Sequence, residues 1–298
     1  MQGDAGWTPL FNGQADWNNK PCLNVDKELK ESESVGRVNL SWNISNDHMA
    51  YFTWSEGYRP GGVQRNPAAG EYLSDFLTNI EIGWKTQWAD NSFQFNGAVF
   101  SQKWEDIQIS FTGDNAITAV NNGPTAKVDG VEAQILWLPS DGLRISSSVA
   151  FYDARLDDDY CNLTNGVCVS PSDILAPKGT ALPVTADFKG NIVARYHFNL
   201  GSFDSYVQGA MVYEGSRGSS LDQSENAILG DLPSYSTLDL AAGINRESWA
   251  VDLFIKNATG EDAPLYYTGE CIPATCGGQT YGVRVKPRTI GVKFTKDF

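Results

Sequence analysis

The sequence predicts an all-β fold, an antiparallel transmembrane β-barrel with about eleven strands. Segment after segment alternates apolar and polar side chains, and an extended strand sorts residues onto two faces with that period. The connections alternate as well, because short turns and long polar loops follow each other along the chain. In a barrel that spans a membrane, the apolar face meets lipid, the polar face lines the lumen, and the short turns share one rim.

Composition limits the protein classes that remain. The chain has 298 residues, 41% of them hydrophobic, and a formal net charge of −14, which argues against nucleic acid as a partner. No run of about eighteen apolar residues occurs, so no transmembrane helix is expected. The segment Met1–Trp7 has neither the basic region nor the apolar core of a signal peptide. We therefore expect either a mature form or a chain that begins partway through a longer protein.

Four of the five cysteines form two close pairs in turn-rich polar stretches. Cys161 is seven residues from Cys168, and Cys271 is five from Cys276. A zinc site is poorly supported, because no Cys-x-x-Cys motif occurs and the two histidines lie far from both pairs in sequence. Disulfides Cys161–Cys168 and Cys271–Cys276 are favoured over unpaired thiols, and they indicate an oxidising compartment. Cys22 is left over, either free or paired with a cysteine elsewhere.

The strands follow in order after residues 1–34, a polar stretch that we interpret as an external loop. The first strand places Val38, Leu40 and Trp42 on one face and Asn39 and Ser41 on the other. By the same pattern, strands are expected at 37–44, 50–55, 79–88, 93–100, 130–137, 143–151, 191–198, 203–213, 235–244, 249–255 and 288–298.

The strand that begins at Phe93 is expected to continue through Ile107 and Ile109, which extend its apolar spacing.

The connections and the aromatic residues support a membrane barrel over a soluble β-sandwich, whose strands are usually shorter. Long loops are expected at about 58–74, 112–125, 157–186, 218–233 and 258–287, and short turns at 45–48, 90–91, 139–142, 201–202 and 245–248. Aromatic residues of the apolar face lie within about three residues of the short turns, as an interfacial girdle would. They are Trp42, Trp88, Phe93, Trp137, Phe198 and Trp249.

No catalytic constellation is recognisable, so an enzyme is not expected. The run Asp157–Asp159 could bind calcium or could be a charged loop. Several ionisable residues are expected on the polar face, where they either contact whatever fills the lumen or are simply hydrated. They are Glu81, Lys85, Glu132, Arg195, His197, Asp239, Asp252 and Lys256.

Several segments resemble the recurrent strand and loop sequences of TonB-dependent outer-membrane receptors. Their order and spacing over residues 35–298 make the resemblance specific, although each segment alone is a weak signal. They are Met49–Gly62, Asn79–Lys85, Asn96–Phe100, Glu105–Gln108, Asn122–Glu132, Lys178–Pro183 and Pro287–Gly291, with the terminal Phe298.

The resemblance implies both architecture and function. Receptors of this family have a 22-stranded barrel closed by an N-terminal plug, so about eleven strands over residues 35–298 correspond to the C-terminal half of a barrel. The plug, the TonB box and the signal peptide have no counterpart in this sequence. The resemblance places the chain in the outer membrane of a Gram-negative bacterium, makes Phe298 a signal for the barrel-assembly machinery, and requires no cofactor.

The implied activity is the TonB-driven import of a scarce nutrient such as a ferric siderophore. A passive porin-like channel and an outer-membrane enzyme or adhesin remain as alternatives. Ligand contacts are expected in the outer loops, from aromatic and arginine side chains of the kind that dominate binding hot spots. The candidates are Tyr58, Arg59, Trp104, Arg217, Tyr266 and Tyr267.

An odd number of strands has a consequence for closure. With about eleven antiparallel strands the first and last run in the same direction, whereas bacterial single-chain barrels have even strand numbers. We therefore expect a curved, open half-barrel with Val38 and Phe294 on unpaired edge strands. We also expect that these 298 residues are a fragment that transports nothing alone and needs further strands as partners.

Overall fold

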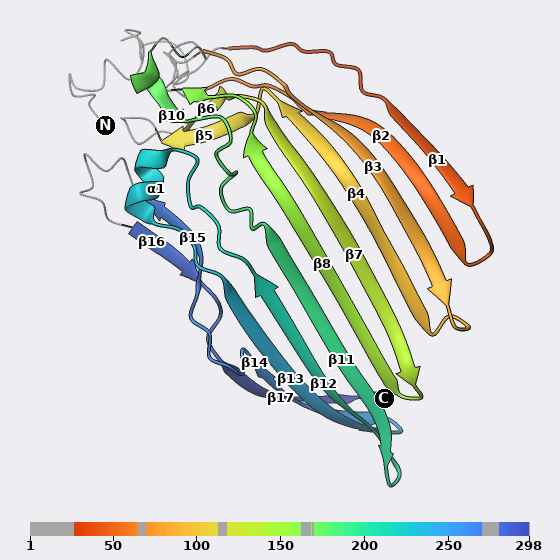
Figure 1. The fold of residues 1–298 in the computed structure, drawn as a ribbon. Coiled ribbons are helices and arrows are strands. Elements are labelled where there is room, and N and C mark those ends of the chain that lie inside the picture. Colours follow the sequence, from red (N-terminus) through yellow and green to blue (C-terminus); the bar gives the residue numbers. More distant parts are fainter. Residues whose placement is uncertain are drawn as a thin grey trace, which may run out of the picture.

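One antiparallel sheet of eleven strands dominates the computed structural model (Figure 1), which describes residues 27–64, 70–112, 118–161, 168, 170–269 and 280–297. Each strand of the large sheet pairs with the next one along the chain, which confirms the predicted fold class. The strands are β1 (Arg37–Asn43), β2 (His48–Arg59), β3 (Asp75–Trp88), β4 (Phe93–Glu105), β7 (Ala126–Ser140), β8 (Leu143–Leu156), β11 (Phe188–Leu200), β12 (Phe203–Glu214), β13 (Tyr235–Arg246), β14 (Trp249–Lys256) and β17 (Thr289–Lys296).

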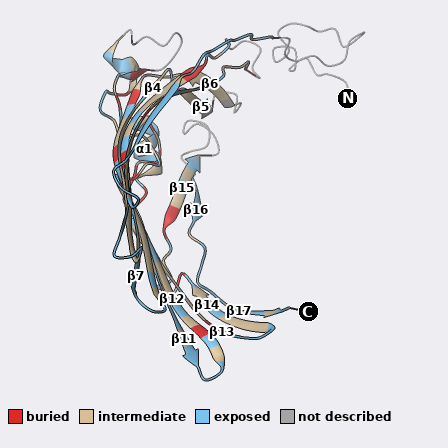
Figure 2. Ribbon diagram, turned by 90° about the vertical axis from the view of Figure 1, so that its right-hand side faces the viewer, coloured by how far each residue is buried: buried red, intermediate tan, exposed pale blue. Residues whose placement is uncertain are grey.

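The sheet is curved and open. Strand β1 lies at one edge and β17 at the other, and no described residue joins them. Val38 therefore pairs only with Trp54 of β2, and Phe294 only with Val251 of β14. Figure 2 shows the curvature with the sheet seen close to edge-on. The expected open half-barrel is confirmed, with Val38 and Phe294 on its two edge strands.

The register puts apolar side chains on one face and polar ones on the other. In one row across six strands, Leu40 pairs with Phe52, and the row continues through Ile82, Val99, Val131 and Phe151. The adjacent row lies on the opposite face, because successive side chains of a strand alternate. It contains Ser41, Tyr51, Gly83, Ala98, Glu132, Ala150, Lys189, Glu214 and Tyr235.

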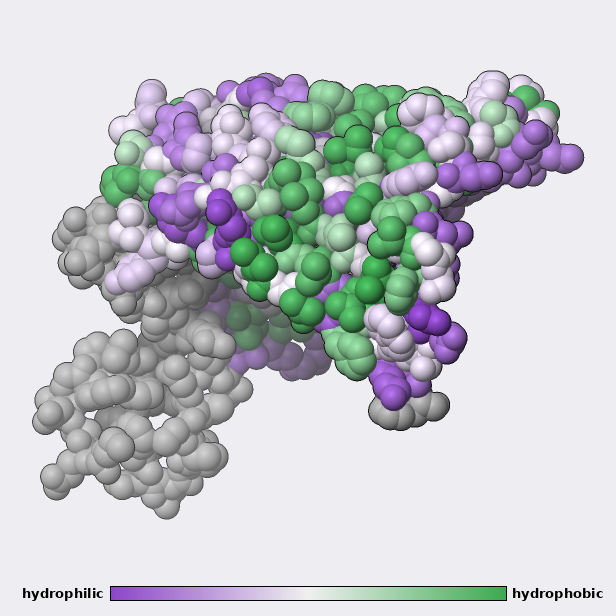
Figure 3. All heavy atoms as spheres, turned by 90° about the horizontal axis from the view of Figure 1, so that it is seen from below, coloured by the Kyte–Doolittle hydropathy of each residue, from purple (hydrophilic) through white to green (hydrophobic). Residues whose placement is uncertain are grey.

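The polar face is the concave one. Ala126 and Leu156 belong to it by register and are buried, because the loops fold back over them on the concave side of the sheet (Figure 2). The opposite, convex face stays uncovered, with Leu40 65% and Ile82 59% exposed. Figure 3 shows hydrophobic residues gathered in one continuous area that is bordered by hydrophilic ones. A lipid-facing wall requires this arrangement.

Glycines on the polar face make room for aromatic rings. The ring of Tyr51 lies over Gly83, where any Cβ would overlap it, and the Tyr51 hydroxyl donates to Glu81 at 2.7 Å. Tyr206 lies over Gly243 in the same way and donates to Asp252 at 2.7 Å. The glycine therefore lets each tyrosine lie flat across its neighbouring strand and reach a carboxylate.

The connections alternate in length as expected. The short ones join β1–β2, β3–β4, β7–β8, β11–β12 and β13–β14 at one rim, and the long ones gather at the other rim (Figure 1). The β7–β8 turn uses Gly142 at φ 82°, a left-handed conformation that costs glycine little. Trp42, Trp88 and Trp137 lie beside short turns and are 68%, 52% and 45% exposed, as residues of an interfacial girdle would be.

The long loops contain regular structure that the alternation does not predict. Three small sheets pair β5 (Gln108–Thr112) with β6 (Thr118–Asn122), β9 (Tyr160–Cys161) with β10 (Ile174–Ala176), and β15 (Pro264–Gly269) with β16 (Thr280–Arg284). A short 3-10 turn, η2 (Pro171–Asp173), precedes β10, and a seven-residue helix, α1 (Gln223–Leu229), lies in the β12–β13 loop. No helix of the described residues is long and apolar enough to cross a membrane.

The predicted continuation of the Phe93 strand through Ile107 and Ile109 is wrong. Strand β4 ends at Glu105, and Asp106 turns the chain with φ 55°. Beyond this turn, the backbone N–H of Gln108 donates to the Asp75 carboxylate at 3.2 Å. Ile107 is buried in the loop cluster rather than exposed to lipid.

The assignment of the two faces predicts that a lysine lowers stability more at a position on the apolar face than at the neighbouring position on the polar face. Ile192 of β11 lies on the apolar face, about midway between Phe188 and the girdle residue Phe198, and Asn191 lies on the polar face. We expect Ile192→Lys to lower the free energy of unfolding in lipid vesicles by about 2–4 kcal/mol, because the ammonium meets hydrocarbon. Asn191→Lys, the matched control, should cost less than about 1 kcal/mol. Equal losses would contradict the assignment.

Candidate functional site

The loop rim is where the buried core of the described chain lies. Its six buried members each come from a different element or connection, and they include Ala126 of β7 and Leu156 of β8 on the polar face of the sheet. Trp104, Ile109, Leu175 and Leu182 pack against them. The remaining members are Ile107, Tyr160, Ala176 and Leu221. The loops are therefore packed together as a body, and the rim presents a preformed surface.

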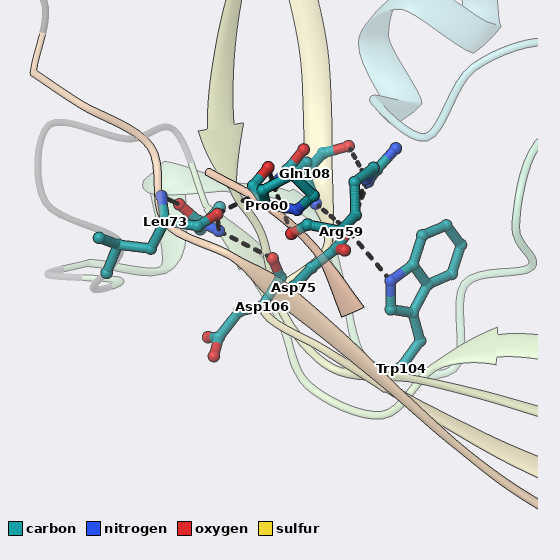
Figure 4. Close-up of polar contacts among 8 residues, drawn as sticks. Arg59, Pro60, Leu73, Asp75, Trp104, Asp106 and Gln108 are labelled. Carbon is teal, nitrogen blue, oxygen red and sulfur yellow. Dashed lines mark hydrogen bonds and ion pairs between the residues drawn. The ribbon is translucent and has the colours of Figure 1, made fainter. Parts of the chain in front are cut away.

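Asp75 is the polar centre of this rim (Figure 4). Its side chain is 3% exposed, and one oxygen, Oδ2, receives hydrogen bonds from three directions. Arg59 donates through Nε at 3.1 Å and through a close Nη2 contact, the indole Nε1 of Trp104 donates at 3.1 Å, and the backbone N–H of Gln108 donates at 3.2 Å. The carboxylate thus joins β2, β3, β4 and the segment that enters β5.

Two amide side chains extend this junction to the backbone of the loops. The Gln108 Nε2 donates to the carbonyls of Pro60 at 2.9 Å and Leu73 at 3.0 Å. Asn122 of β6 accepts from Leu73 N–H at 2.7 Å and donates to the Asp106 carbonyl at 2.9 Å. The two amides therefore pair backbone groups of irregular loops that no sheet ladder serves.

A second buried anchor holds the other half of the rim. The Arg217 side chain is 2% exposed and lies 3.7 Å from the Glu214 carboxylate. It donates to the carbonyl of Leu265 in β15 at 3.2 Å, and its guanidinium carbon lies 5.7 Å from the centre of the Tyr235 ring. This contact ties the β12–β13 loop to the β15–β16 hairpin.

The six candidate ligand residues fall into two groups. Arg59 and Trp104 donate to Asp75 inside the rim, and Arg217 donates to the carbonyls of Gly215 and Leu265. Tyr58 belongs by register to the apolar face and lies 6.3 Å from the ring of Phe76. Tyr266 and Tyr267 lie in β15, where Tyr266 is 45% exposed. The structure thus brings Arg59 and Trp104 together and leaves the other four apart from them.

Three of the residues that hold the rim were not among the candidates. Asp75, Gln108 and Asn122 lie where the alternating pattern ends, and composition gave no reason to single them out. A signal existed nevertheless, because Gln108 and Asn122 lie in the segments Glu105–Gln108 and Asn122–Glu132 that resemble receptor sequences. Recurrent polar residues at strand ends point to loop anchoring of this kind.

The cysteines and charged loop residues are partly described. Cys161 is bonded to Cys168, with 5.4 Å between their Cα atoms, which confirms this pair. Cys22, Cys271, Cys276 and Phe298 lie outside the described residues. Within the described part of the chain no group of three His, Cys, Asp or Glu side chains is arranged to hold a metal ion.

Charge pairing shifts two pKa values in the β8–β11 loop. Lys178 donates to Asp157 at 2.9 Å, and this hydrogen bond lowers the pKa of Asp157 while it raises the pKa of Lys178. Both side chains are well exposed, so the pair adds little to stability. Burial raises the pKa of Tyr160, and the negative charges of Asp222 and Glu225 raise it further. Tyr160 is therefore a neutral member of the loop core at any ordinary pH.

The Asp75 junction predicts that removal of its buried carboxylate costs more stability than removal of an exposed carboxylate. We expect Asp75→Ala to lower the free energy of unfolding in detergent by about 1–3 kcal/mol, because it leaves the Trp104 and Gln108 donors unpaired. Arg59 loses its ion pair with Asp75 in this variant, but water compensates part of that loss because the Arg59 side chain is 50% exposed. Hydrogen exchange at the Gln108 amide should accelerate.

The matched control is Asp153→Ala, which breaks an ion pair with Arg155 whose side chains are 65% and 49% exposed. Its cost should stay below about 1 kcal/mol, and exchange at Gln108 should not change. An Asp75→Ala variant with the exchange rate of the wild type would show that the junction does not hold the loops.

Comparison with known proteins gives the family of this chain. The family model described as "TonB dependent receptor-like, beta-barrel" matches residues 6–258. Among curated relatives, the pesticin receptor of Yersinia enterocolitica is 24% identical over 111 residues, which cover 36% of this chain and 16% of the relative.

Solved structures share the fold at low sequence identity. The ferric yersiniabactin uptake receptor FyuA from Yersinia pestis superposes with a TM-score of 0.70 at 16% identity, covering 89% of this chain and 37% of that one. The siderophore receptor PiuA from Acinetobacter baumannii gives 0.65 at 17% identity, covering 88% and 35%. The chain thus spans little more than a third of the length of either structure. It belongs to the TonB-dependent receptor family, a family of outer-membrane receptors and transporters, and carries β-barrel sequence of that family.

Proposed function

We propose that the chain forms part of the wall and the outer rim of a receptor that imports a ferric siderophore across the outer membrane. The observation that carries the proposal is the combination of an eleven-stranded wall with long loops packed into one body at a single rim. A passive pore needs the wall but not a packed rim. The similar structures include receptors named for ferric yersiniabactin and ferric catecholate, which supports siderophores as the ligand class.

The partners belong to the same proposal. Import against a gradient requires energy, and receptors of this family receive it from TonB through their plug. We propose that strands and a plug outside this sequence complete the barrel, that residues 35–298 form one wall domain after an external loop at 1–34, and that Phe298 is read by the barrel-assembly machinery.

The position of one loop hairpin supports a proposal for the ligand site. Tyr266 and Tyr267 lie in the β15–β16 hairpin, which reaches into the concave side of the sheet (Figure 2). Aromatic side chains give large contact areas at a small entropic cost. We propose that these two tyrosines contact ligand directly, and that Arg59, Trp104 and Arg217 act by fixing the loops around it. Tyr58, on the apolar face, would lie outside the ligand path.

A growth experiment tests the proposed function. A strain that lacks the gene should fail to grow under iron limitation on at least one ferric siderophore of a panel of catecholates, hydroxamates and phenolates. Growth should return with the intact gene, and only in cells that contain TonB. Undiminished growth on every siderophore would contradict the proposal, and restoration without TonB would favour the passive channel.

Ligand affinity of the intact receptor tests the assignment of the tyrosines. Tyr266→Ala should weaken binding of the ferric siderophore identified by growth by about tenfold or more, the loss expected of a hot-spot residue. Tyr58→Ala is the matched control, because it removes an equally exposed ring from the apolar face and should leave the Kd within about twofold. The reverse order of effects would move the ligand path away from the hairpin.

A further inference from the structure

A groove on the lipid-facing side of the wall crosses strands β3, β4, β7 and β8, and its volume is about 650 Å³. Two rows of the convex face line it, and the row between them, which points by register to the concave face, supplies its floor. The first row contains Ile82, Val99, Val131 and Phe151, the second contains Ile80, Ser101, Asp129 and Asp153, and the floor contains Phe100, Gly130, Tyr152 and Asp187.

The groove is apolar at one end and open to the membrane. Its first row ranges from 40% exposed at Val131 to 59% at Ile82. Phe151 continues sideways into a line of rings, with centroid distances of 4.6 Å to Phe188 and 5.7 Å from Phe188 to Tyr213. Aromatic rings gather at the depth of lipid headgroups. The groove therefore begins in hydrocarbon, where an acyl chain fills it, and ends near the headgroups on the long-loop side.

Three kinds of side chain follow one another from the groove toward the loop rim. On β4 they are Val99, Ser101 and Lys103, which share the convex face because they lie two residues apart. The register places the same order beside them on the next two strands. An apolar row, a row of hydrogen-bond acceptors and a row of cations thus succeed each other. The equivalent residues are Val131, Asp129 and Lys127 on β7, and Phe151, Asp153 and Arg155 on β8.

The acceptor row and the cation row each place like charges side by side. Lys127 is the register partner of both Lys103 and Arg155, and Asp129 is the partner of Asp153. Like charges directly opposite each other destabilise a sheet. Ion pairs along each strand offset this repulsion, but their side chains remain 43–65% exposed, so both rows are open to a ligand. The pairs are Lys103–Glu105 at 2.7 Å, Lys127–Asp129 at 2.8 Å and Arg155–Asp153 at 2.5 Å.

We propose that this groove binds a phosphorylated glycolipid with amide-linked acyl chains. One acyl chain lies along the apolar row, the hydroxyl and amide N–H groups next to it donate to the acceptor row, and a phosphate meets the cation row. Lysine and arginine side chains bind phosphate through charge-assisted hydrogen bonds. A glycerophospholipid matches the order of the rows less well, because its chains are joined by esters that have no N–H or O–H to donate. The site lies outside the lumen and holds whatever ligand the receptor imports.

Lipid binding to the full chain in detergent micelles tests the proposal. Native mass spectrometry follows a titration with lipid A, a phosphorylated glucosamine disaccharide with amide-linked chains, and a second titration with phosphatidylglycerol. We expect one lipid A to bind with a Kd about tenfold or more below that of phosphatidylglycerol, the ratio that one charge-assisted hydrogen bond supplies. Phosphatidylglycerol offers chains and a phosphate without donors beside the chains, so equal affinities would overturn the proposal.

A bulky side chain in the groove separates this site from the rest of the lipid-facing surface. Val131→Trp fills the groove and should weaken lipid A binding about tenfold. Val207→Trp is the matched control, because Val207 lies on the apolar face of β12 and is 46% exposed, against 40% for Val131. It should leave the Kd within about twofold. Equal effects of the two tryptophans would show that lipid A does not occupy the groove.

The phosphate contact has its own test. Lys127→Gln should weaken the binding of lipid A several-fold, whereas lipid A stripped of its phosphates should bind the wild type and Lys127→Gln alike. Lys30→Gln is the control, because Lys30 is an exposed lysine that pairs with Glu28 at 3.1 Å outside the sheet. An unchanged Kd for lipid A in Lys127→Gln, or an equal loss with the dephosphorylated lipid, would contradict a phosphate at the cation row.

Discussion

The pairing of backbone groups is the constraint on which this structure depends. In hydrocarbon every N–H and C=O must be hydrogen-bonded within protein, and each unpaired group costs on the order of several kcal/mol. Ten ladders between eleven strands meet this requirement everywhere except along the free sides of β1 and β17. Those two strands run in the same direction, so an odd number of further antiparallel strands is needed to close the wall. The strands that β1 and β17 accept are therefore restricted in direction as well as in number.

The same constraint explains where the hydrophobic core lies. A wall with lipid on one side and lumen on the other buries little of its own surface, so large apolar residues such as Leu40 and Ile82 stay exposed. The described core is instead at the loop rim, where loop residues pack against the ends of β7 and β8 around Ala126, Leu156 and Tyr160. Stable loops of this length need their own packing and polar anchors, which Asp75 and Arg217 provide. The rim is thus held by side-chain contacts that the backbone ladders of the wall do not supply, although some of these side chains belong to the wall strands.

The alternating pattern predicts the wall well and the rim poorly, for physical reasons. Period two is imposed by lipid on one face, so Val38, Leu40 and Trp42 reveal β1 without any tertiary information. The pattern fails at Ile107, where the spacing is right but Asp106 turns the chain and the side chain enters the loop core. Nothing local distinguishes lipid from a loop core as the destination of an apolar residue.

The candidate site shows the same limit more strongly. Arg59 and Trp104 were chosen as residue types that bind ligands, yet both donate to Asp75, a residue 16 positions from one and 29 from the other. Whether an arginine faces a ligand or a buried carboxylate depends on contacts between distant segments. Sequence alone therefore indicates the loop rim as the candidate functional end. It does not distinguish residues that would contact a ligand from residues that hold the loops in place.

The central claim is that the chain is a membrane wall with one lipid face and one lumen face, and spin labelling tests it most directly. Single labels at successive positions from Lys189 to Tyr196 of β11, in lipid bilayers, would be compared for collision with oxygen, which concentrates in lipid, and with a water-soluble nickel chelate. The account predicts that oxygen dominates at Gly190, Ile192, Ala194 and Tyr196, and that the chelate dominates at the alternate positions. Accessibility without a period of two, or with the opposite phase, would contradict it.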